Sequence, residues 1–195
     1  MHVLILGATG MVGQGVLGEC LRASDVESVV SVGRSHLGVS HPKLTSVVIP
    51  DLFDLQPAAS QLTDIDACFY CLGVSSTGMS AEAYERVTHD LTLAIATTLA
   101  ASSPDAVFTY VSGAGTSETS RMRWARVKGR TERELMELFP RAYMFRPGFI
   151  QPLHGIRSRT RFYRLAYAAS GPLVSLLRRL SPRLVSTTED VGLAM

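Results

Sequence analysis

The stretch "LGATGMVGQG", residues 6–15, decides the fold of this chain. It carries glycines at positions 7, 10 and 13, directly after the apolar run "HVLIL" and directly before a helical apolar pattern. Between a strand and a helix, this spacing is typical of a loop that binds the diphosphate of a dinucleotide. Gly7 permits the tight turn, Gly10 lets the backbone approach a pyrophosphate, and Gly13 lets the helix pack closely on the strand.

The start of the helix after this motif is expected to face the phosphates. Its free N–H groups and its partial positive charge favour a bound anion there. The alternative is an ordinary glycine-rich turn, and the position between a strand and a helix argues against it. The motif residues expected to contact a dinucleotide are Gly7, Thr9, Gly10, Met11, Val12 and Gly13.

Short apolar segments alternate with helical patterns along the rest of the chain. Strands are expected in "HVLIL", "ESVVSVG", "TSVVI", "DACFYCL", "AVFTYVS" and "AYMFR", because these segments are short, β-branched or aromatic and bounded by turn residues. Helices are expected over about 12–21, 82–102 and 121–138. This alternation predicts an α/β fold, a Rossmann-like doubly wound parallel sheet with helices on both faces. The 195 residues are expected to form a single domain.

Composition excludes several other classes of protein. Hydrophobic residues make up 46% and charged residues 18% of the chain, as in a soluble α/β domain. A net charge of +2 is too small to indicate a nucleic-acid partner. The Cys68-x-x-Cys71 pair lies within a predicted strand, where residues three apart face opposite sides, so we expect two buried thiols. The five histidines have no metal-ligand spacing, and no metal site is expected.

The location of the protein is also predicted from the sequence. The N-terminus has no basic region ahead of its short apolar run, so it does not read as a secretory signal. No stretch approaches the roughly 20 apolar residues of a membrane-spanning helix. Three cysteines without disulfide-like spacing favour a reducing compartment. These features predict a cytoplasmic protein with no integral membrane segment.

The end of the second predicted strand indicates which dinucleotide is bound. NAD sites place an acid there, about 20 residues after the glycine motif, to bind the ribose. This chain reads "VVSVGRS" instead, and Arg34 with Ser35 stands where a 2′-phosphate would lie. The sequence therefore favours NADP(H) over NAD(H); the alternative is that Arg34 is a solvated loop residue. By topology, Asp51 and Leu52 after the third strand are expected to flank the adenine.

At this point the chain resembles the short-chain dehydrogenase/reductase superfamily, over nearly its whole length. The glycine spacing is that of extended and atypical members. "FRPG" at 145–148 looks like their segment after the sixth strand, and "TTEDVGLAM" at 187–195 looks like the start of their penultimate helix. Within the superfamily it is most similar to atypical, epimerase-like members related to the Tat-interacting-protein-like oxidoreductases. The family pattern continues past residue 195.

The resemblance implies further site residues. Cys71, Leu72 and Gly73 fit the loop that covers the cofactor, and Pro147 with Gly148 fits the segment beside the nicotinamide. Residues 150–185 are implied to form a small substrate-facing lobe. Within it, arginines between 157 and 164 could hold an anionic substrate, touch a membrane surface or form a solvated helix face.

The resemblance also implies a Tyr-x-x-x-Lys pair on the helix after the fifth strand. Lys128 fits the lysine that binds the nicotinamide ribose, and it is one of only two lysines in a chain with 17 arginines. Trp124 occupies the tyrosine position, and its indole can donate a hydrogen bond but cannot titrate as a phenol does. The alternatives are a surface lysine and a packing aromatic. Ser112 fits the family's catalytic serine; if the register is one residue later, Gly113 takes that place and Thr116 or Ser120 could substitute.

We therefore expect an NAD(P)-dependent oxidoreductase of the atypical short-chain class that acts on an unidentified small molecule. Whether it is an enzyme stays open, because Trp124 replaces the tyrosine. One alternative is a non-catalytic NADP-binding redox sensor, and another is a nucleotide-sugar epimerase or dehydratase. Pairing of the two long helices, as in related dimers, would make a homodimer possible.

Overall fold

The computed structural model describes residues 1–151 and 185–195. Its centre is a six-stranded sheet in the order β3-β2-β1-β4-β5-β6, in which all neighbouring strands are parallel. This is the strand order of a doubly wound dinucleotide-binding fold, so the predicted fold class is confirmed. The strands are β1 (His2–Leu6), β2 (Ser28–Gly33), β3 (Leu44–Val48), β4 (Ala67–Tyr70), β5 (Val107–Val111) and β6 (Ala142–Phe145).

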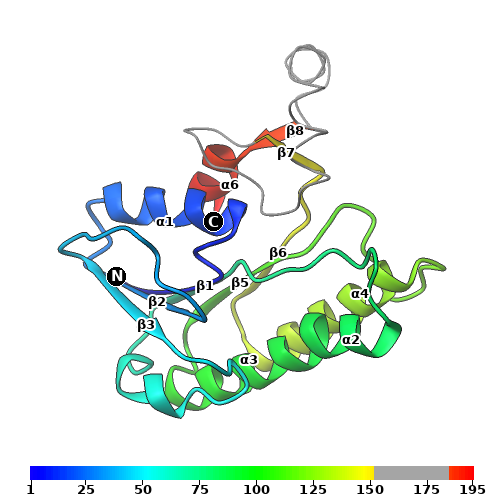
Figure 1. Cartoon of the computed structure of the whole chain (residues 1–195), viewed down its shortest axis with the longest axis horizontal. Helices are drawn as coiled ribbons and strands as arrows, with labels where there is room; N and C mark the ends of the chain where they lie inside the picture. The colour runs from blue at the N-terminus through cyan, green and yellow to red at the C-terminus, as the bar shows by residue number, and fades with distance from the viewer. Residues whose placement is uncertain (152–184) are drawn as a thin grey trace.

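Helices cover both faces of the sheet (Figure 1). On one face lie α1 (Met11–Arg22) and α6 (Thr188–Ala194). On the other lie α2 (Ala81–Glu85), the π-helical turn η2 (Arg86–Asp90), α3 (Leu91–Ser102) and α4 (Arg123–Leu138). Alternate residues of β1 enter two separate cores, because side chains alternate across a strand. Val3 and Ile5 pack with α1, whereas Leu4 and Leu6 pack with α3.

Two of the predicted helices differ from expectation. The helix expected over 82–102 contains the π-turn η2, which inserts one extra residue per turn and re-aims the side chains around it. In this turn the Thr92 hydroxyl donates a hydrogen bond to the Thr88 carbonyl (2.8 Å), so this carbonyl has a side-chain partner that the sequence pattern does not reveal. The helix expected over 121–138 begins at Arg123, because Met122 has an extended backbone and its N–H donates to the Ser120 hydroxyl (3.1 Å).

Some elements have no counterpart in the sequence prediction. A 3-10 turn spans Gln56–Gln61, and β7 (Phe149–Gln151) pairs in parallel with β8 (Val185–Thr187) as a second, two-stranded sheet. Helix α6, by contrast, lies in the segment 187–195 where the resemblance implies the start of a helix. It begins at a capping box, in which Thr187 Oγ1 accepts from the Asp190 N–H and the Asp190 carboxylate accepts from the Thr187 N–H. Most of the lobe expected over 150–185 lies outside the described residues.

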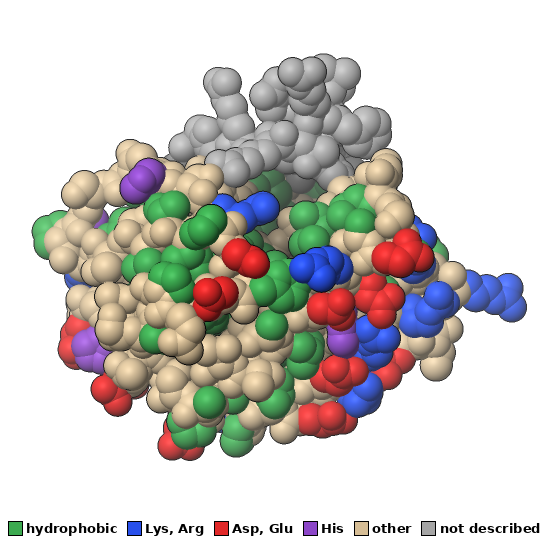
Figure 2. All heavy atoms as spheres, turned by 60° about the horizontal axis from the view of Figure 1, so that its bottom comes forward, with side chains coloured by type: hydrophobic (Ala, Val, Ile, Leu, Met, Phe, Trp, Pro, Cys, Tyr) green, Lys and Arg blue, Asp and Glu red, His purple; other side chains and the backbone are tan. Residues whose placement is uncertain are grey.

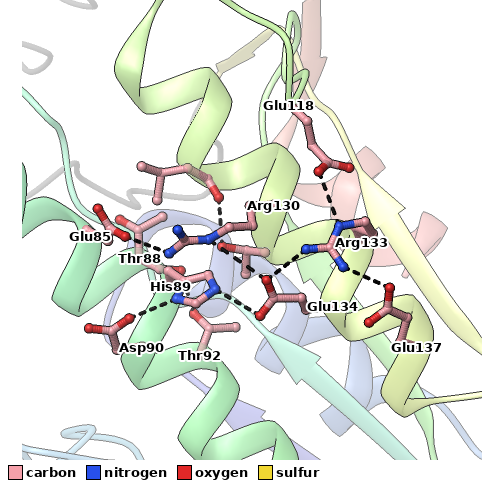
Figure 3. Close-up of polar contacts among 12 residues, drawn as sticks. Glu85, Thr88, His89, Asp90, Thr92, Glu118, Arg130, Arg133, Glu134 and Glu137 are labelled. Carbon is pink, nitrogen blue, oxygen red and sulfur yellow. Dashed lines mark hydrogen bonds and ion pairs between the residues drawn. The ribbon is translucent and has the colours of Figure 1, made fainter.

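Charged side chains connect the helices on the α4 side of the sheet (Figure 3). His89 lies between Asp90 (2.8 Å) and Glu134 (3.0 Å), so it joins η2 to α4. Arg130 and Arg133 extend the network to Glu85, Glu118, Glu134 and Glu137. On the right of the face drawn in Figure 2, acidic and basic side chains are interspersed. Within 1–151 and 185–195, no helix is long and apolar enough to cross a bilayer.

Candidate functional site

The glycine loop joins β1 to α1 at the carboxyl edge of the sheet. Gly7 has a φ of +83°, a left-handed conformation that favours glycine. A Cβ on Gly7 would also lie 2.8 Å from the backbone of Cys71 and Leu72, so the first turn presses against the segment after β4. A Cβ on Gly13 would lie 2.2 Å from the carbonyl oxygen of Gly7, which is far inside van der Waals contact. Both glycines have the packing roles that the motif predicts.

Gly10 stands at the N-cap of α1 and lines the adjoining cavity. Its N–H donates to the Gly7 carbonyl (2.8 Å), and no side chain caps the N-terminus of α1. The first N–H groups of this 12-residue helix therefore remain available to an anion at the end of the cavity. Met11 and Val12 belong to the first turn of α1 and do not line the cavity described below.

A cavity of about 410 Å³ opens beside the glycine loop, at the carboxyl ends of β1, β3 and β4. A smaller cavity of about 70 Å³ adjoins it at the end of β2 and shares Gly7, Thr9, Arg34, Leu52 and Leu72 with it. The structure thus brings together residues predicted from four separate segments. The predicted residues that line one or both cavities are Gly7, Thr9, Gly10, Arg34, Ser35, Asp51, Leu52, Cys71, Leu72 and Gly73.

Sequence reasoning missed several other lining residues. Pro50 and Phe53 flank the predicted Asp51-Leu52 pair, so extending that prediction by one residue each way would have found them. Val87 and Leu91 reach the cavity from η2 and α3, and no sequence motif marks them. Phe53 is fixed by the guanidinium of Arg86, which stacks over its ring at 4.6 Å from the centroid.

Among the described residues, Arg34 and Asp51 are the charged side chains that line the larger cavity. Arg34 is exposed, follows the end of β2 and lines both cavities. The Asp51 carboxylate accepts a hydrogen bond from the N–H of Phe53 (2.9 Å), which holds the turn after β3. A cation beside the end of β2 suits a phosphate on the ribose better than a bare hydroxyl, because a guanidinium binds phosphate oxygens in pairs.

Lys128 lies on α4 beneath the carboxyl end of β5. Its Nζ donates to the carbonyls of Val111 (3.1 Å) and Ser112 (3.2 Å) and lies 5.3 Å from the centre of the Tyr110 ring. Burial lowers the pKa of Lys128 to about 8, and the nearby Glu132 partly opposes that shift. An ammonium has three N–H donors, and contacts among the described residues use two of them, which leaves one for a ligand. The surface-lysine alternative does not agree with this environment.

The residues around Lys128 form the rest of the expected catalytic group. Ser112 is buried, and its Oγ lies 3.0 Å from Oγ1 of the buried Thr116. Trp124 is partly buried, and its ring lies 3.5 Å from the position that a Gly113 Cβ would take. Trp124 therefore packs over the backbone after β5. Lys128, Ser112 and Trp124 belong to one neighbourhood, although none of them lines the two cavities.

The "FRPG" segment is bonded to that neighbourhood through its backbone. The Ser112 N–H donates to the carbonyl of Phe145 (2.7 Å), and the Ala114 N–H donates to the carbonyl of Pro147 (3.0 Å). Pro147 and Gly148 thus lie beside the loop after β5, in a region that neither cavity reaches. The arginines predicted between 157 and 164 lie outside the described residues.

Cys20 and Cys68 are buried packing residues, whereas Cys71 is only partly buried, contrary to the expectation of two buried thiols, and also lines the larger cavity. Cys68 and Cys71 enter opposite cores, as the strand period predicts, and burial raises the pKa of both thiols. Cys20 is also free, with its pKa raised to about 11 mainly by burial. Such neutral thiols are poor nucleophiles. Among the described residues, no group of three or more histidine, cysteine or acidic side chains could hold a metal ion.

Comparison with known proteins finds relatives of this chain by sequence. No family model matches the chain. Protein HTATIP2 of Rattus norvegicus is 31% identical over 151 residues, which cover 76% of this chain and 62% of that protein. Protein FMP52, mitochondrial, of Eremothecium gossypii is 30% identical over 152 residues, which cover 77% and 66%. The chain therefore spans less than two thirds of the length of these relatives. The similarity to these two proteins agrees with the resemblance to atypical, epimerase-like short-chain dehydrogenases that the sequence motifs carry.

Solved structures share the fold over nearly the whole chain. A UDP-glucose 4-epimerase has a TM-score of 0.73 at 17% identity and covers all of this chain and 70% of its own. The yeast methylglyoxal/isovaleraldehyde reductase Gre2, complexed with NADPH, has a TM-score of 0.69 at 15% identity, with 98% and 72% covered. At this identity, the likeness shows a common fold and no more.

The relatives correct the predicted location. The fungal proteins that match this chain, including those of Eremothecium gossypii and Aspergillus terreus, are named as mitochondrial, which contradicts the cytoplasmic prediction. The sequence argument rested on the secretory signal, the membrane span and the cysteine spacing. None of these features distinguishes cytosol from mitochondrion, so the prediction had no physical basis on this point.

Proposed function

We propose that this chain binds NADP(H) and acts as an oxidoreductase on a small carbonyl compound or the corresponding alcohol. The observation that carries the proposal is the cavity between the glycine loop and Arg34. It offers an uncapped helix N-terminus for a diphosphate and a guanidinium for a 2′-phosphate. The cofactors named for related structures, NADPH for yeast Gre2 and NAD for MoeE5, are of this class.

The proposed contacts follow from the positions of the residues. Gly7, Gly10 and Gly13 would hold the diphosphate, Arg34 and Ser35 the 2′-phosphate, and Asp51 and Leu52 the adenine. Lys128 would use its remaining N–H for the second ribose, beside Pro147 and Gly148. A bound nicotinamide supplies or accepts the hydride. The buried Ser112–Thr116 hydroxyl pair would donate a hydrogen bond to the substrate oxygen and pass it the proton that reduction requires, which water would replace, because the Trp124 indole cannot exchange a proton as a phenol does.

Trp124 favours one alternative, a non-catalytic NADP-binding redox sensor. Its ring packs over Gly113, in the neighbourhood where family enzymes place the tyrosine. A sensor would bind NADPH without consuming it. The epimerase or dehydratase alternative is supported by likeness of fold alone.

Cofactor binding is tested with Arg34→Ala. A charge-assisted hydrogen bond contributes about 1.5–3 kcal/mol, so NADPH affinity should fall roughly tenfold to a hundredfold. NADH affinity should change little, since NADH has no 2′-phosphate. Arg22→Ala, which removes an exposed α1 arginine outside both cavities, is the matched control. Fluorescence titrations with both cofactors measure the effect, and equal losses for NADPH and NADH would make Arg34 a bystander.

Turnover separates the enzyme from the sensor. An oxidoreductase should oxidise NADPH in the presence of some member of a panel of small aldehydes and ketones, followed at 340 nm. Trp124→Tyr should increase that rate if proton donation limits the reaction, because it restores a titratable phenol four residues before Lys128. Tight NADPH binding with no turnover in either protein would favour the sensor.

A further inference from the structure

Glu132 is a buried carboxylate between the two halves of the proposed nicotinamide site. It lies on α4, one helical turn after Lys128, and its side chain is only 2% exposed. The Nε of Arg146 donates to both of its oxygens (3.0 and 3.2 Å), and Nη2 of Arg146 forms a further bond to Oε2. Arg146 follows β6 directly and precedes the Pro147-Gly148 segment. One carboxylate therefore connects the lysine-bearing helix to the turn beside the expected nicotinamide.

Stability alone is a weak reason for this ion pair. Burying a carboxylate costs several kcal/mol, and apolar residues of the same volume often stabilise a protein as well or better. The pair is also asymmetric, since the Arg146 side chain is 51% exposed while Glu132 is enclosed. A buried negative charge does, however, act strongly on a neighbouring buried cation, because little water screens the interaction.

Lys128 is that neighbouring cation. Three titratable or charged side chains surround Lys128: Tyr110 on β5, Glu132 on the same helix, and Arg146 after β6. Arg146 acts on Lys128 through its ion pair with Glu132. Tyr84 on α2 lies beyond Tyr110, and burial raises the pKa of both phenols, so they are neutral at pH 8. Among these groups, only Glu132 carries a negative charge that opposes the loss of the lysine proton.

We propose that Glu132 is a positioning residue of this site, whose carboxylate, held by Arg146, keeps Lys128 protonated and fixes the Pro147-Gly148 segment beside it. The consequence for cofactor binding rests on the function proposed above. The charge coupling itself does not, since it exists in the protein without a ligand.

The titration of Lys128 can be measured directly in this chain. It contains only two lysines, Lys43 and Lys128, so protein labelled with ¹³C-lysine gives two Cε resonances to follow in a pH titration. Lys43 donates to the carbonyl of Ala23 (2.6 Å) and serves as the internal reference. Lys128→Met assigns the second resonance by removing it.

Two substitutions should shift the Lys128 titration in opposite directions. Glu132→Gln removes the negative charge and keeps the shape, so the midpoint should move to lower pH by roughly one unit. Arg146→Gln removes the positive charge that faces Glu132, so the midpoint should rise. Glu134→Gln, on the same helix but in the outer ion network, is the control and should leave the midpoint unchanged. If neither Glu132→Gln nor Arg146→Gln moves the midpoint, the proposal is wrong.

The second readout is NADPH binding between pH 6 and 9. Wild-type affinity should fall as pH rises through about 8, where Lys128 loses its proton. Glu132→Gln should shift this fall to lower pH and reduce affinity at pH 8 about tenfold, while Glu132→Asp, which keeps the charge, should restore most of it. A shifted lysine midpoint with unchanged NADPH binding would support the coupling and refute Lys128 as a cofactor residue. Should Glu132→Gln fail to fold, the Arg146→Gln titration still decides the question.

Discussion

At the residue scale, glycines of one chain have quite different reasons to be glycine. Gly7 needs its left-handed φ and a close approach to Cys71, and Gly13 needs space against the Gly7 carbonyl. Gly18, on the same helix as Gly13, has only the flexible end of Arg22 within 4 Å of a Cβ. The sequence does not distinguish these three glycines, whereas the atoms around each one determine whether another residue can replace it.

Substituting alanine at Gly13 and Gly18 should therefore change stability in opposite directions. Gly13→Ala places a Cβ 2.2 Å from a backbone oxygen and should destabilise the protein by roughly 1–3 kcal/mol. Gly18→Ala improves helix propensity and should stabilise it by up to about 1 kcal/mol. Urea unfolding of both variants measures the difference. Equal effects would show that α1 does not press on the glycine loop as described.

At the element scale, the π-turn η2 connects the sheet's helical layer to the cavity. Val87 of this turn lines the cavity while His89 bonds to Glu134 of α4, so one irregular turn contacts both the cavity and the neighbouring helix. Irregular turns of this kind are frequent at functional sites. The Phe53–Arg86 stack ties the same turn to the segment after β3.

The ion network between η2 and α4 should contribute measurably to stability through Glu134. This carboxylate accepts from His89 (3.0 Å) and Arg133 (3.0 Å) and is 27% exposed, so it couples two helices. Glu134→Gln should destabilise the protein by about 1 kcal/mol, with a smaller effect at high salt.

Glu137 provides the comparison on the same helix. Within residues 1–151 and 185–195 it pairs with Arg133 alone and is 65% exposed, so Glu137→Gln should change the free energy of unfolding by no more than about 0.5 kcal/mol. Denaturant unfolding at low and high salt compares the two variants. A similar small change for both would mean that His89 does not hold α4 through Glu134.

At the scale of the whole molecule, the two ends of the chain pack against each other. Helix α6 lies beside α1 (Figure 1), and the contact is close because both helices present glycine. A Cβ on Gly15 would lie 2.5 Å from the carbonyl oxygen of Thr188, and one on Gly192 would lie 2.8 Å from the side chain of Glu19. The start of α6 is thereby held next to the helix that follows the glycine loop.

Gly15→Ala should therefore displace α6 even though alanine is the better helix former. The loss should exceed the gain of up to about 1 kcal/mol in propensity, because the obstruction is backbone rather than a flexible side chain. Hydrogen exchange should increase at the amides of α6, and Gly18→Ala should leave it unchanged. Normal protection of α6 in Gly15→Ala would contradict the close packing of these two helices.

Much of this protein was determined by local sequence. Buried parallel strands are short apolar runs, and the six runs identified all became strands of the sheet, with boundaries close to those expected. The glycine motif located the loop between β1 and α1, and the strand period placed Cys68 and Cys71 in opposite cores. These features depend on neighbours along the chain, so the sequence contains the information.

Only the tertiary structure decided the rest, because it depends on contacts between distant segments. The π-turn, the entry of Val87 and Leu91 into the cavity, and the β7–β8 pair have no local signal. Glu132 is the clearest case. In the sequence it is one more charged helix residue, and only the approach of Arg146 after β6 encloses it beside Lys128. A carboxylate that a segment far away in the sequence shields from water acts more strongly on the charge of Lys128, and spacing along the helix alone does not reveal this shielding.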